Sequence, residues 1–292
     1  MSKRTVVKSF VVVSELVALL VITFFTSCKQ AGTTPFQYGT EIDSARYYFH
    51  KGWHEIMDNG RWTASELAFR KAVDWDPDWA LGKSLLGRIS RDVNERERLY
   101  EEIQLLYPDI GSDERLLVDV NLLSLEAANN RDRGIKNSQS FNQERRKIAE
   151  ANFGKFARTY PQDDYFKAEY IEFLHANYGS ELALDSLMIL ATEDQMKLGF
   201  YISYSASLNL DLGNIEDAKF LGESLQPLML DSTYTSYLKF KAELAMAQDS
   251  MDIAYAYLKE IVAIDSNHII AKGMLNRVEG ALSLKDSSNA SN

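Results

Sequence analysis

The spacing of the apolar residues constrains the fold of this chain more than any other feature. From Ile42 onward, apolar residues recur every three or four positions, as in the stripe Ala45, Phe49, Trp53 and Ile56. This spacing is the period of an α-helix, whereas a half-buried strand would alternate at every second residue. Similar stripes follow at 67–73, 99–106, 116–125, 148–156, 166–174, 182–190, 201–212, 218–225, 237–247 and 253–264. Because short polar breaks separate them, the sequence predicts an all-α fold of antiparallel helices.

The helical stripes repeat at a regular interval. Ala149, Ala183, Ala218 and Ala254 are spaced by 34, 35 and 36 residues, and each stands near the start of a predicted second helix. Small residues at matching positions allow two helices to approach closely, while bulky neighbours fill the groove opposite. Self-similarity at this interval indicates an array of stacked helix pairs.

The best-formed pair spans residues 47–77. Asp58-Asn59-Gly60 predicts a tight turn, since glycine accepts positive φ, and Pro77 predicts the end of the second helix. With Gly60, Trp62, Phe69 and Ala72 in register before Pro77, the chain resembles the tetratricopeptide repeat family, although Ser65 replaces the alanine usual there and later units lack the proline. The resemblance implies a right-handed superhelical array of antiparallel helix pairs, an α-solenoid, over residues 42–284.

The N-terminus has the pattern of an export signal. Lys3, Arg4 and Lys8 precede a largely apolar run over 9–25, and Thr26-Ser27 leads to Cys28, the only cysteine. This arrangement resembles the lipobox of bacterial lipoproteins, in which a diacylglycerol is attached to the cysteine, although Phe25 and Glu15 are atypical. We therefore expect a signal peptide over 1–27 and lipid attachment at Cys28.

The location of the chain follows from this reading. A lipidated Cys28 predicts a protein anchored by its lipid in the cell envelope, at the outer membrane. An uncleaved membrane anchor and cleaved, soluble secretion remain as alternatives. Residues 28–41 lack a hydrophobic period and are predicted to be a flexible tether, and the polar residues 285–292 a disordered tail.

Charge limits the classes of partner. The formal net charge is −10, and an acidic chain is poorly suited to nucleic acid, whose phosphates need Lys and Arg. The polar stretch 129–140 is longer than a repeat turn requires. We interpret it as a surface loop, with a partner contact as the alternative.

No pattern for catalysis or for a bound cofactor is found. His50 and His54 lie four residues apart, but the Glu required between them in a zinc protease is missing. His175 and His268 are expected at the surface or at helix ends. Further carboxylates are expected at helix starts and on exposed faces, where Asp and Glu complement the helix dipole: Asp163, Asp164, Glu169, Glu172, Glu181 and Asp185. We therefore predict no enzymatic activity, no metal and no cofactor.

The resemblance places certain first-helix residues on a concave groove. The implied groove residues are Tyr47, His50, His54, Tyr165, Glu172, His175 and Phe200. A groove with aromatic and acidic members suits a peptide or helix from another envelope protein. The sequence thus predicts a scaffold for protein–protein interaction. The alternative is a glycan-binding or glycan-processing lipoprotein of an uptake system.

Overall fold

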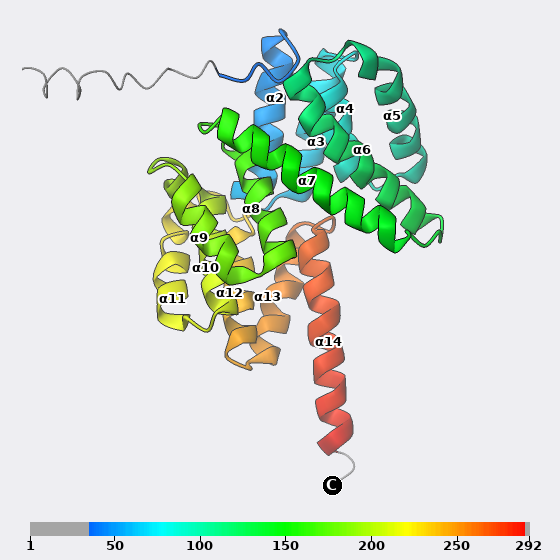
Figure 1. Cartoon of the computed structure of the whole chain (residues 1–292). Helices are drawn as coiled ribbons and strands as arrows, with labels where there is room; N and C mark the ends of the chain where they lie inside the picture. Colours follow the sequence, from blue (N-terminus) through cyan, green and yellow to red (C-terminus); the bar gives the residue numbers. More distant parts are fainter. Residues whose placement is uncertain (1–34, 290–292) are drawn as a thin grey trace, which may run out of the picture. The chain divides into compact units, whose positions relative to one another are not determined.

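The structure of the chain is a computed structural model that describes residues 35–289, with side chains described as far as Leu284. Between these limits the chain forms α-helices and no strand, so the predicted all-α class is confirmed there (Figure 1). The α-helices are α2 (Asp43–Trp53), α3 (Trp62–Trp75), α4 (Ala80–Ile89), α5 (Val93–Leu106), α6 (Ser112–Asp132), α7 (Gln139–Thr159), α8 (Tyr165–Tyr178), α9 (Ser180–Leu190), α10 (Gly199–Asp211), α11 (Ile215–Glu223), α12 (Ser236–Ala247), α13 (Met251–Ile264) and α14 (Ile269–Asn289). Short helical turns join some of them: η1 (His54–Asp58, a π-helix), η2 (Tyr107–Asp109), η3 (Gln195–Lys197) and η4 (Gln226–Leu228).

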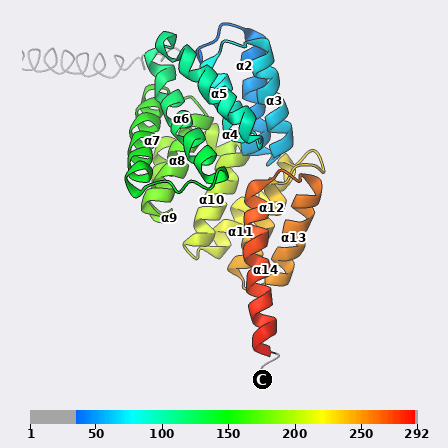
Figure 2. The same cartoon turned by 90° about the vertical axis from the view of Figure 1, so that its right-hand side faces the viewer.

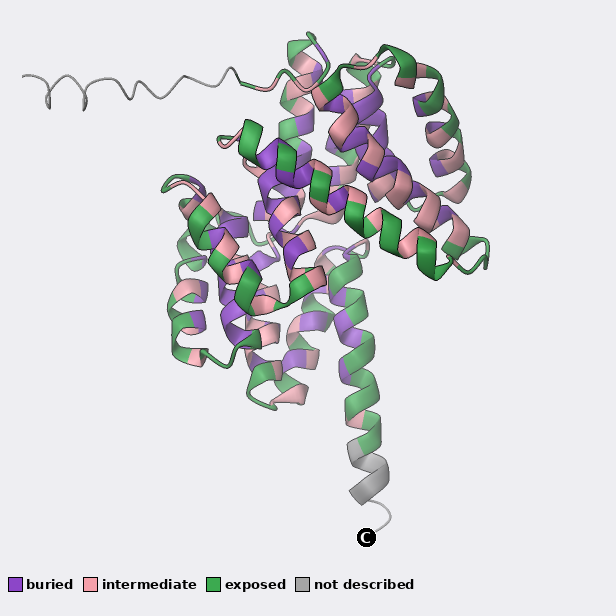
Figure 3. Ribbon diagram, viewed as in Figure 1, coloured by how far each residue is buried: buried purple, intermediate pink, exposed green. Residues whose placement is uncertain are grey.

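Each α-helix packs against the next helix in the chain. In addition, α4 contacts α6, and α10 contacts α12 and η1. Figure 2 shows α12, α13 and α14 side by side, as their contacts require. Buried residues lie on the sides of the helices that face other helices, and exposed residues lie opposite (Figure 3). This is the distribution that an apolar stripe of period 3.6 produces.

Two helices have no counterpart among the predicted stripes, namely α4 and α14. Nine of the ten residues of α4 are buried, including Lys83 and Ser84. The segment is nonetheless amphipathic, and its polar Lys83 is buried through an ion pair with Glu102 of α5. Only one face of α14 is covered, through Ala271, Met274 and Val278.

The turn after η1 forms as the sequence predicts. Gly60 adopts φ +73, and Trp62 begins α3 immediately afterwards. The predicted stop is also present, because α3 ends at Trp75 and Asp76 leaves the helical region before Pro77. The N-terminus of α5 has a side-chain cap, since the Asp92 carboxylate accepts hydrogen bonds from two backbone amides of the first turn.

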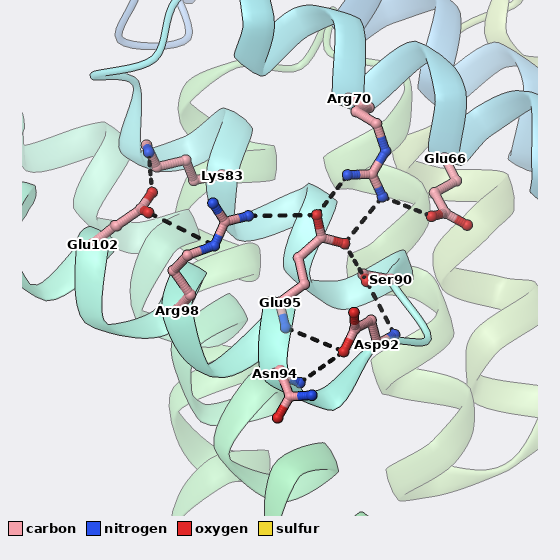
Figure 4. A network of polar contacts seen from close by, with 9 residues as sticks. All are labelled: Glu66, Arg70, Lys83, Ser90, Asp92, Asn94, Glu95, Arg98 and Glu102. Carbon is pink, nitrogen blue, oxygen red and sulfur yellow. Dashed lines mark hydrogen bonds and ion pairs between the residues drawn. The ribbon is translucent and has the colours of Figure 1, made fainter.

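A polar network fixes α3 and α4 to α5 (Figure 4). The Arg70 guanidinium of α3 donates to both carboxylate oxygens of Glu95, at 2.5 and 3.0 Å, and to Glu66 at 2.9 Å. The Ser90 hydroxyl also donates to Glu95, at 2.6 Å. The hydrogen bonds from Arg70 lower the pKa of Glu95 to about 2.

The first helix pair contacts helices far along the chain. The Phe200 amide donates to Asp58 Oδ1 at 2.8 Å, and the Ser236 hydroxyl donates to the Asp58 carbonyl at 2.7 Å. The Thr63 amide and hydroxyl donate to Asp265 at 2.9 and 2.6 Å. In a simple open array each repeat contacts only its neighbours. The contacts of Asp58 and Thr63 with distant helices go beyond this pattern, and the regular repeat interval in the sequence did not predict them.

The structure corrects the predicted tether over 28–41. The Phe36 ring packs against Phe156 at a centroid distance of 4.9 Å, and the Tyr38 hydroxyl donates to Asp163. The Trp79 indole donates to the Tyr38 carbonyl at 2.6 Å, and Thr40 is buried. A segment without hydrophobic period can still bury its aromatic rings between helices. Residues 36–40 therefore pack on the helices, while Cys28, the signal segment 1–27 and the tether residues up to 34 lie outside the described residues.

Two further boundaries differ from the prediction. Half of the polar stretch 129–140 is helical, because α6 continues to Asp132 and α7 begins at Gln139, and the predicted surface loop is reduced to a turn over 133–138. The Ser138 hydroxyl accepts a hydrogen bond from the Phe141 amide and so caps α7. The predicted disordered tail over 285–292 is helical as far as Asn289, where α14 ends, and residues 290–292 lie outside the described residues.

Candidate functional site

A pocket of about 330 Å³ lies among α2, η1, α3, α4, α8, α10, α12 and α14. Its lining is mainly apolar and includes aromatic rings from α2, α3 and α10. The aromatic and aliphatic residues of the lining are Trp53, Ile56, Met57, Trp62, Phe69, Leu85, Ile89, Phe200, Tyr204, Ile269 and Ile270. The polar side chains are Arg88, Glu169, Glu172, Ser203, Ser236, Lys239 and His268. We call this cavity the central pocket.

The π-helix η1 positions one wall of the central pocket. It follows α2 directly, and its last residue, Asp58, is buried. Asp58 Oδ2 accepts hydrogen bonds from the Tyr165 hydroxyl at 3.0 Å and is 2.9 Å from His54 Nδ1, while Oδ1 accepts from the Phe200 amide. Asp58 therefore ties η1 to α8 and to the start of α10. Single π-helical turns inside helices are frequent at functional sites.

Ring contacts fix the aromatic walls. The Trp53 indole stacks on Tyr165 with centroids 5.7 Å apart and meets Phe69 edge-on at 5.8 Å. Phe200 stacks on Tyr204 at 5.0 Å. Ring pairs at these distances are favourable beyond the area that they bury. The walls are therefore rigid surfaces formed before any guest enters.

The charged groups of the pocket are largely paired with one another. Arg88 donates to both oxygens of Glu169, at 2.9 and 3.0 Å, and to the Asn121 side chain at 3.1 Å. Lys239 forms an ion pair with Glu243 at 2.6 Å. A bidentate Arg–carboxylate pair holds both partners in a fixed geometry. Arg88 and Glu169 therefore form a nearly neutral polar patch in an apolar cavity.

Glu172 differs from its neighbour Glu169. Within residues 35–289, its carboxyl group has no hydrogen bond and no ion pair. Burial and the nearby charge of Glu169 raise the pKa of Glu172 to about 8. At neutral pH the group is mainly protonated, so it can donate a hydrogen bond to a guest.

Two buried N–H groups at the pocket have no acceptor. His268 Nδ1 accepts a hydrogen bond from the Ala271 amide at 3.2 Å, so the ring proton of the neutral histidine resides on Nε2. This Nε2 and the Trp53 indole nitrogen are buried and unpaired among the described residues. Burial lowers the pKa of His268 to about 4, and the charge of Lys239 contributes. A buried donor without an acceptor costs about 1–3 kcal/mol, which a guest with acceptor atoms could offset.

The structure brings some of the predicted groove residues together and separates others. Glu172 and Phe200 line the central pocket, and Tyr165 and His54 meet beside it at Asp58. His175 lies behind the lining, where its ring bonds to the hydroxyls of Tyr204 at 2.8 Å and Ser180 at 3.0 Å.

The other two predicted groove residues lie away from the pocket. Tyr47 is exposed on α2 and contacts Tyr48. His50 meets the Tyr38 ring edge-on at 4.8 Å. Burial and the charge of Arg46 lower the pKa of His50. In residues 35–289 no group of three or more His, Cys, Asp or Glu side chains could hold a metal ion.

The structure corrects some expectations about polar residues and confirms others. Glu169 was expected at a helix start or on an exposed face, yet it lies within α8 and is 5% exposed. Asp163 is also buried, at 7% exposed, but it stands at a helix start as expected, where it accepts a hydrogen bond from the Phe166 amide at 2.8 Å. His268 is at a helix end as expected, because it directly precedes α14, but it is 2% exposed and does not lie at the surface. Glu169 and Asp163 are buried because partners from distant segments satisfy them, namely Arg88 for Glu169 and Tyr38 for Asp163.

The sequence also gave no direct signal for Arg88, Lys239 or Trp62 as pocket residues. No family model matches the chain, and no curated protein matches it. Of the helices in the described range, none has the length and apolar character required to cross a bilayer.

Proposed function

We propose that this chain is a non-enzymatic binding protein that holds a protein or peptide partner of the cell envelope through the central pocket. A lipid on Cys28 would tether it to the outer membrane. In this proposal the helix pairs form a right-handed, tetratricopeptide-like superhelix, and the central pocket lies on its concave side. The partner would insert an apolar or aromatic side chain between the rings of Trp53 and Phe200.

The lining of the pocket is the observation that carries the proposal. Binding sites are typically concave and apolar, with a few polar groups that fix the orientation of the guest. A volume of about 330 Å³ is at the small end of the range for ligand sites and suits one bulky anchor rather than a whole peptide. Interfaces commonly concentrate their binding energy in such anchors. The unpaired donors of Trp53 and His268 would bind acceptor atoms next to the anchor.

Site-directed photocrosslinking in the native envelope tests this proposal. Ile270 lines the pocket and is 45% exposed, whereas Ile253 is 53% exposed on α13 outside it. A photoreactive residue at 270 should capture one defined partner, and the same residue at 253 should not. An Ile270→Asp substitution should weaken the binding of that partner by about tenfold, since a charge opposes an apolar contact. Equal capture at both positions would contradict the proposal.

A glycan-binding or glycan-processing role is the second candidate, and two carboxyl groups favour it. Glu169 and Glu172 both line the pocket, and burial raises the pKa of Glu172 to about 8. A protonated and an ionised carboxyl group are the pair that glycoside hydrolysis requires. However, Arg88 holds Glu169, and both groups project from the same side of α8, whereas glycosidase carboxylates flank the scissile bond.

Turnover distinguishes the two candidates. Incubation with envelope polysaccharides should release no reducing ends if the chain only binds. Release that disappears in a Glu172→Gln variant would establish the glycan-processing alternative instead.

The anchor is tested separately by fractionation. A Cys28→Ala variant cannot be lipidated, so we expect it to leave the membrane fraction. Unchanged fractionation of this variant would refute the lipid anchor without affecting the pocket.

A further inference from the structure

A second cavity, of about 460 Å³, lies beside the turn 133–138 between α6 and α7. Its lining is more polar than that of the central pocket, and the two cavities share no lining residue. Three cationic side chains line this cavity: Arg131 at the end of α6, Lys136 in the turn and Arg145 on α7. We call it the turn cavity.

The turn cavity is lined by cations without carboxylates. None of its lining residues is Asp or Glu, although the whole chain has a net charge of −10. Arg131 forms an ion pair with Asp132, whose carboxylate is also ion-paired with Arg96. Lys136 and Arg145 have no ion pair with any residue of the described range. Positive charge is therefore left uncompensated at this cavity of an acidic protein.

Arg145 is the most unusual member of this group. It is half-buried, and its buried Nε has no hydrogen-bond acceptor among residues 35–289. Burial and the neighbouring charges of Arg146 and Arg88 lower its pKa, so each of these influences opposes its charge. Removing a cation from water without a partner is unfavourable, and an anion in the cavity would offset this cost.

The turn is held by its own hydrogen bonds, so the cavity is formed in advance. The Asn137 side chain donates to the Ala127 carbonyl at 3.1 Å and accepts from Asn130 at 2.8 Å. The Ile135 amide donates to the Asn130 carbonyl at 2.8 Å. Since Asn137 is occupied in this way, Lys136 and Arg145 are the cationic side chains of the lining that could hold a guest without first breaking an ion pair.

We propose that the turn cavity binds a phosphate-like anionic group. The planar Arg145 guanidinium would donate hydrogen bonds to its oxygens, and Lys136 would add a second, mobile charge. A free phosphorylated solute and a phospholipid headgroup both present this chemistry. The proposal does not depend on the function of the central pocket, because the two sites share no residues.

Thermal unfolding of the purified full chain in neutral detergent measures the binding. Inorganic phosphate is titrated in one arm and short-chain phosphatidylglycerol in the other, with chloride holding the ionic strength constant. Ligand that binds only the folded chain raises Tm in proportion to ln(1 + [L]/Kd). Lys136→Gln and Arg145→Gln should each weaken binding about tenfold. Lys155→Gln on the exposed side of α7 is the matched loss of charge outside the cavity, and it should have little effect.

The two arms identify the source of the anion. Tighter binding of the lipid assigns the cavity to a headgroup, and tighter binding of phosphate assigns it to a free solute. The Lys136→Gln variant separates a loss of binding from misfolding. Lys136 is exposed, so this substitution should leave the Tm of the unliganded chain unchanged. The absence of a Tm shift in both arms, or an equal loss of binding in Lys155→Gln, would overturn the proposal.

Discussion

Replacement of Asp58 by alanine should destabilise the fold more than any exposed substitution. The carboxylate is 5% exposed and accepts hydrogen bonds from the Phe200 amide and the Tyr165 hydroxyl, in addition to its contact with His54. Alanine would leave the first two donors without an acceptor in a buried position. The exposed His54 ring can bond to water instead.

The expected magnitude follows from these two donors. A buried donor that loses its acceptor costs about 1–3 kcal/mol, and bonds to an ionised carboxylate lie at the upper end. Asp58→Ala should therefore reduce the free energy of unfolding by about 3–5 kcal/mol. For a chain of this size the corresponding fall in Tm is about 10 °C. Asp58→Asn keeps one oxygen for the Phe200 amide, so its loss should be about half as large.

Calorimetry and urea titration of three variants measure the effect. Asp185→Ala is the matched control, because Asp185 is exposed on α9 and its carboxylate has no partner in the described part of the chain. This control should change stability by less than about 0.5 kcal/mol. A loss below about 1 kcal/mol in Asp58→Ala, or a greater loss in Asp58→Asn, would refute the assigned role of the carboxylate.

Three further predictions concern the turn glycine and two titrating carboxyl groups. Gly60→Ala should lower the free energy of unfolding by about 2–3 kcal/mol, because φ is +73 and the new Cβ would lie 2.4 Å from the Thr235 hydroxyl. Gly213 has φ +79 but open space around it, so Gly213→Ala should lower the free energy of unfolding by less in the same urea titration. Arg70 lowers the pKa of Glu95, so the stability that Glu95 contributes is fully present above pH 4.5, its ordinary pKa, and is lost as the pH falls toward 2. Between about pH 6 and pH 3, the Glu95→Gln variant should therefore lose less stability than the wild type. The pKa of Glu172 is raised instead, so stability is lost as the pH rises from 4.5 through 8. If Glu172→Gln loses as much stability as the wild type between about pH 5 and pH 9, this assignment is wrong.

The candidate site could be predicted only in part. Phe200 and Glu172 were placed in a groove by the repeat resemblance, and both line the central pocket. Tyr47 was placed there by the same reasoning but is exposed outside the pocket. The resemblance assigns the same role to equivalent positions in every unit. The pocket has no such symmetry, because residues from η1 and α14 close it.

The sequence by itself determined the helices and several of their ends. The period of the apolar residues, the turn at Gly60 and the stop before Pro77 are encoded within a few neighbouring residues, so they can be deduced without the rest of the chain. The helices α4 and α14 are the exceptions, since no predicted stripe corresponds to either of them.

Only the tertiary structure decided which of these segments meet. It placed Trp53 in one pocket with His268, bonded Asp58 to the start of α10, and packed Phe36 against α7. It also made Glu169 an ion-paired carboxylate and Glu172 a protonated one, three residues apart on the same helix. Burial and charge depend on how distant helices are placed, and local periodicity contains no information about that placement.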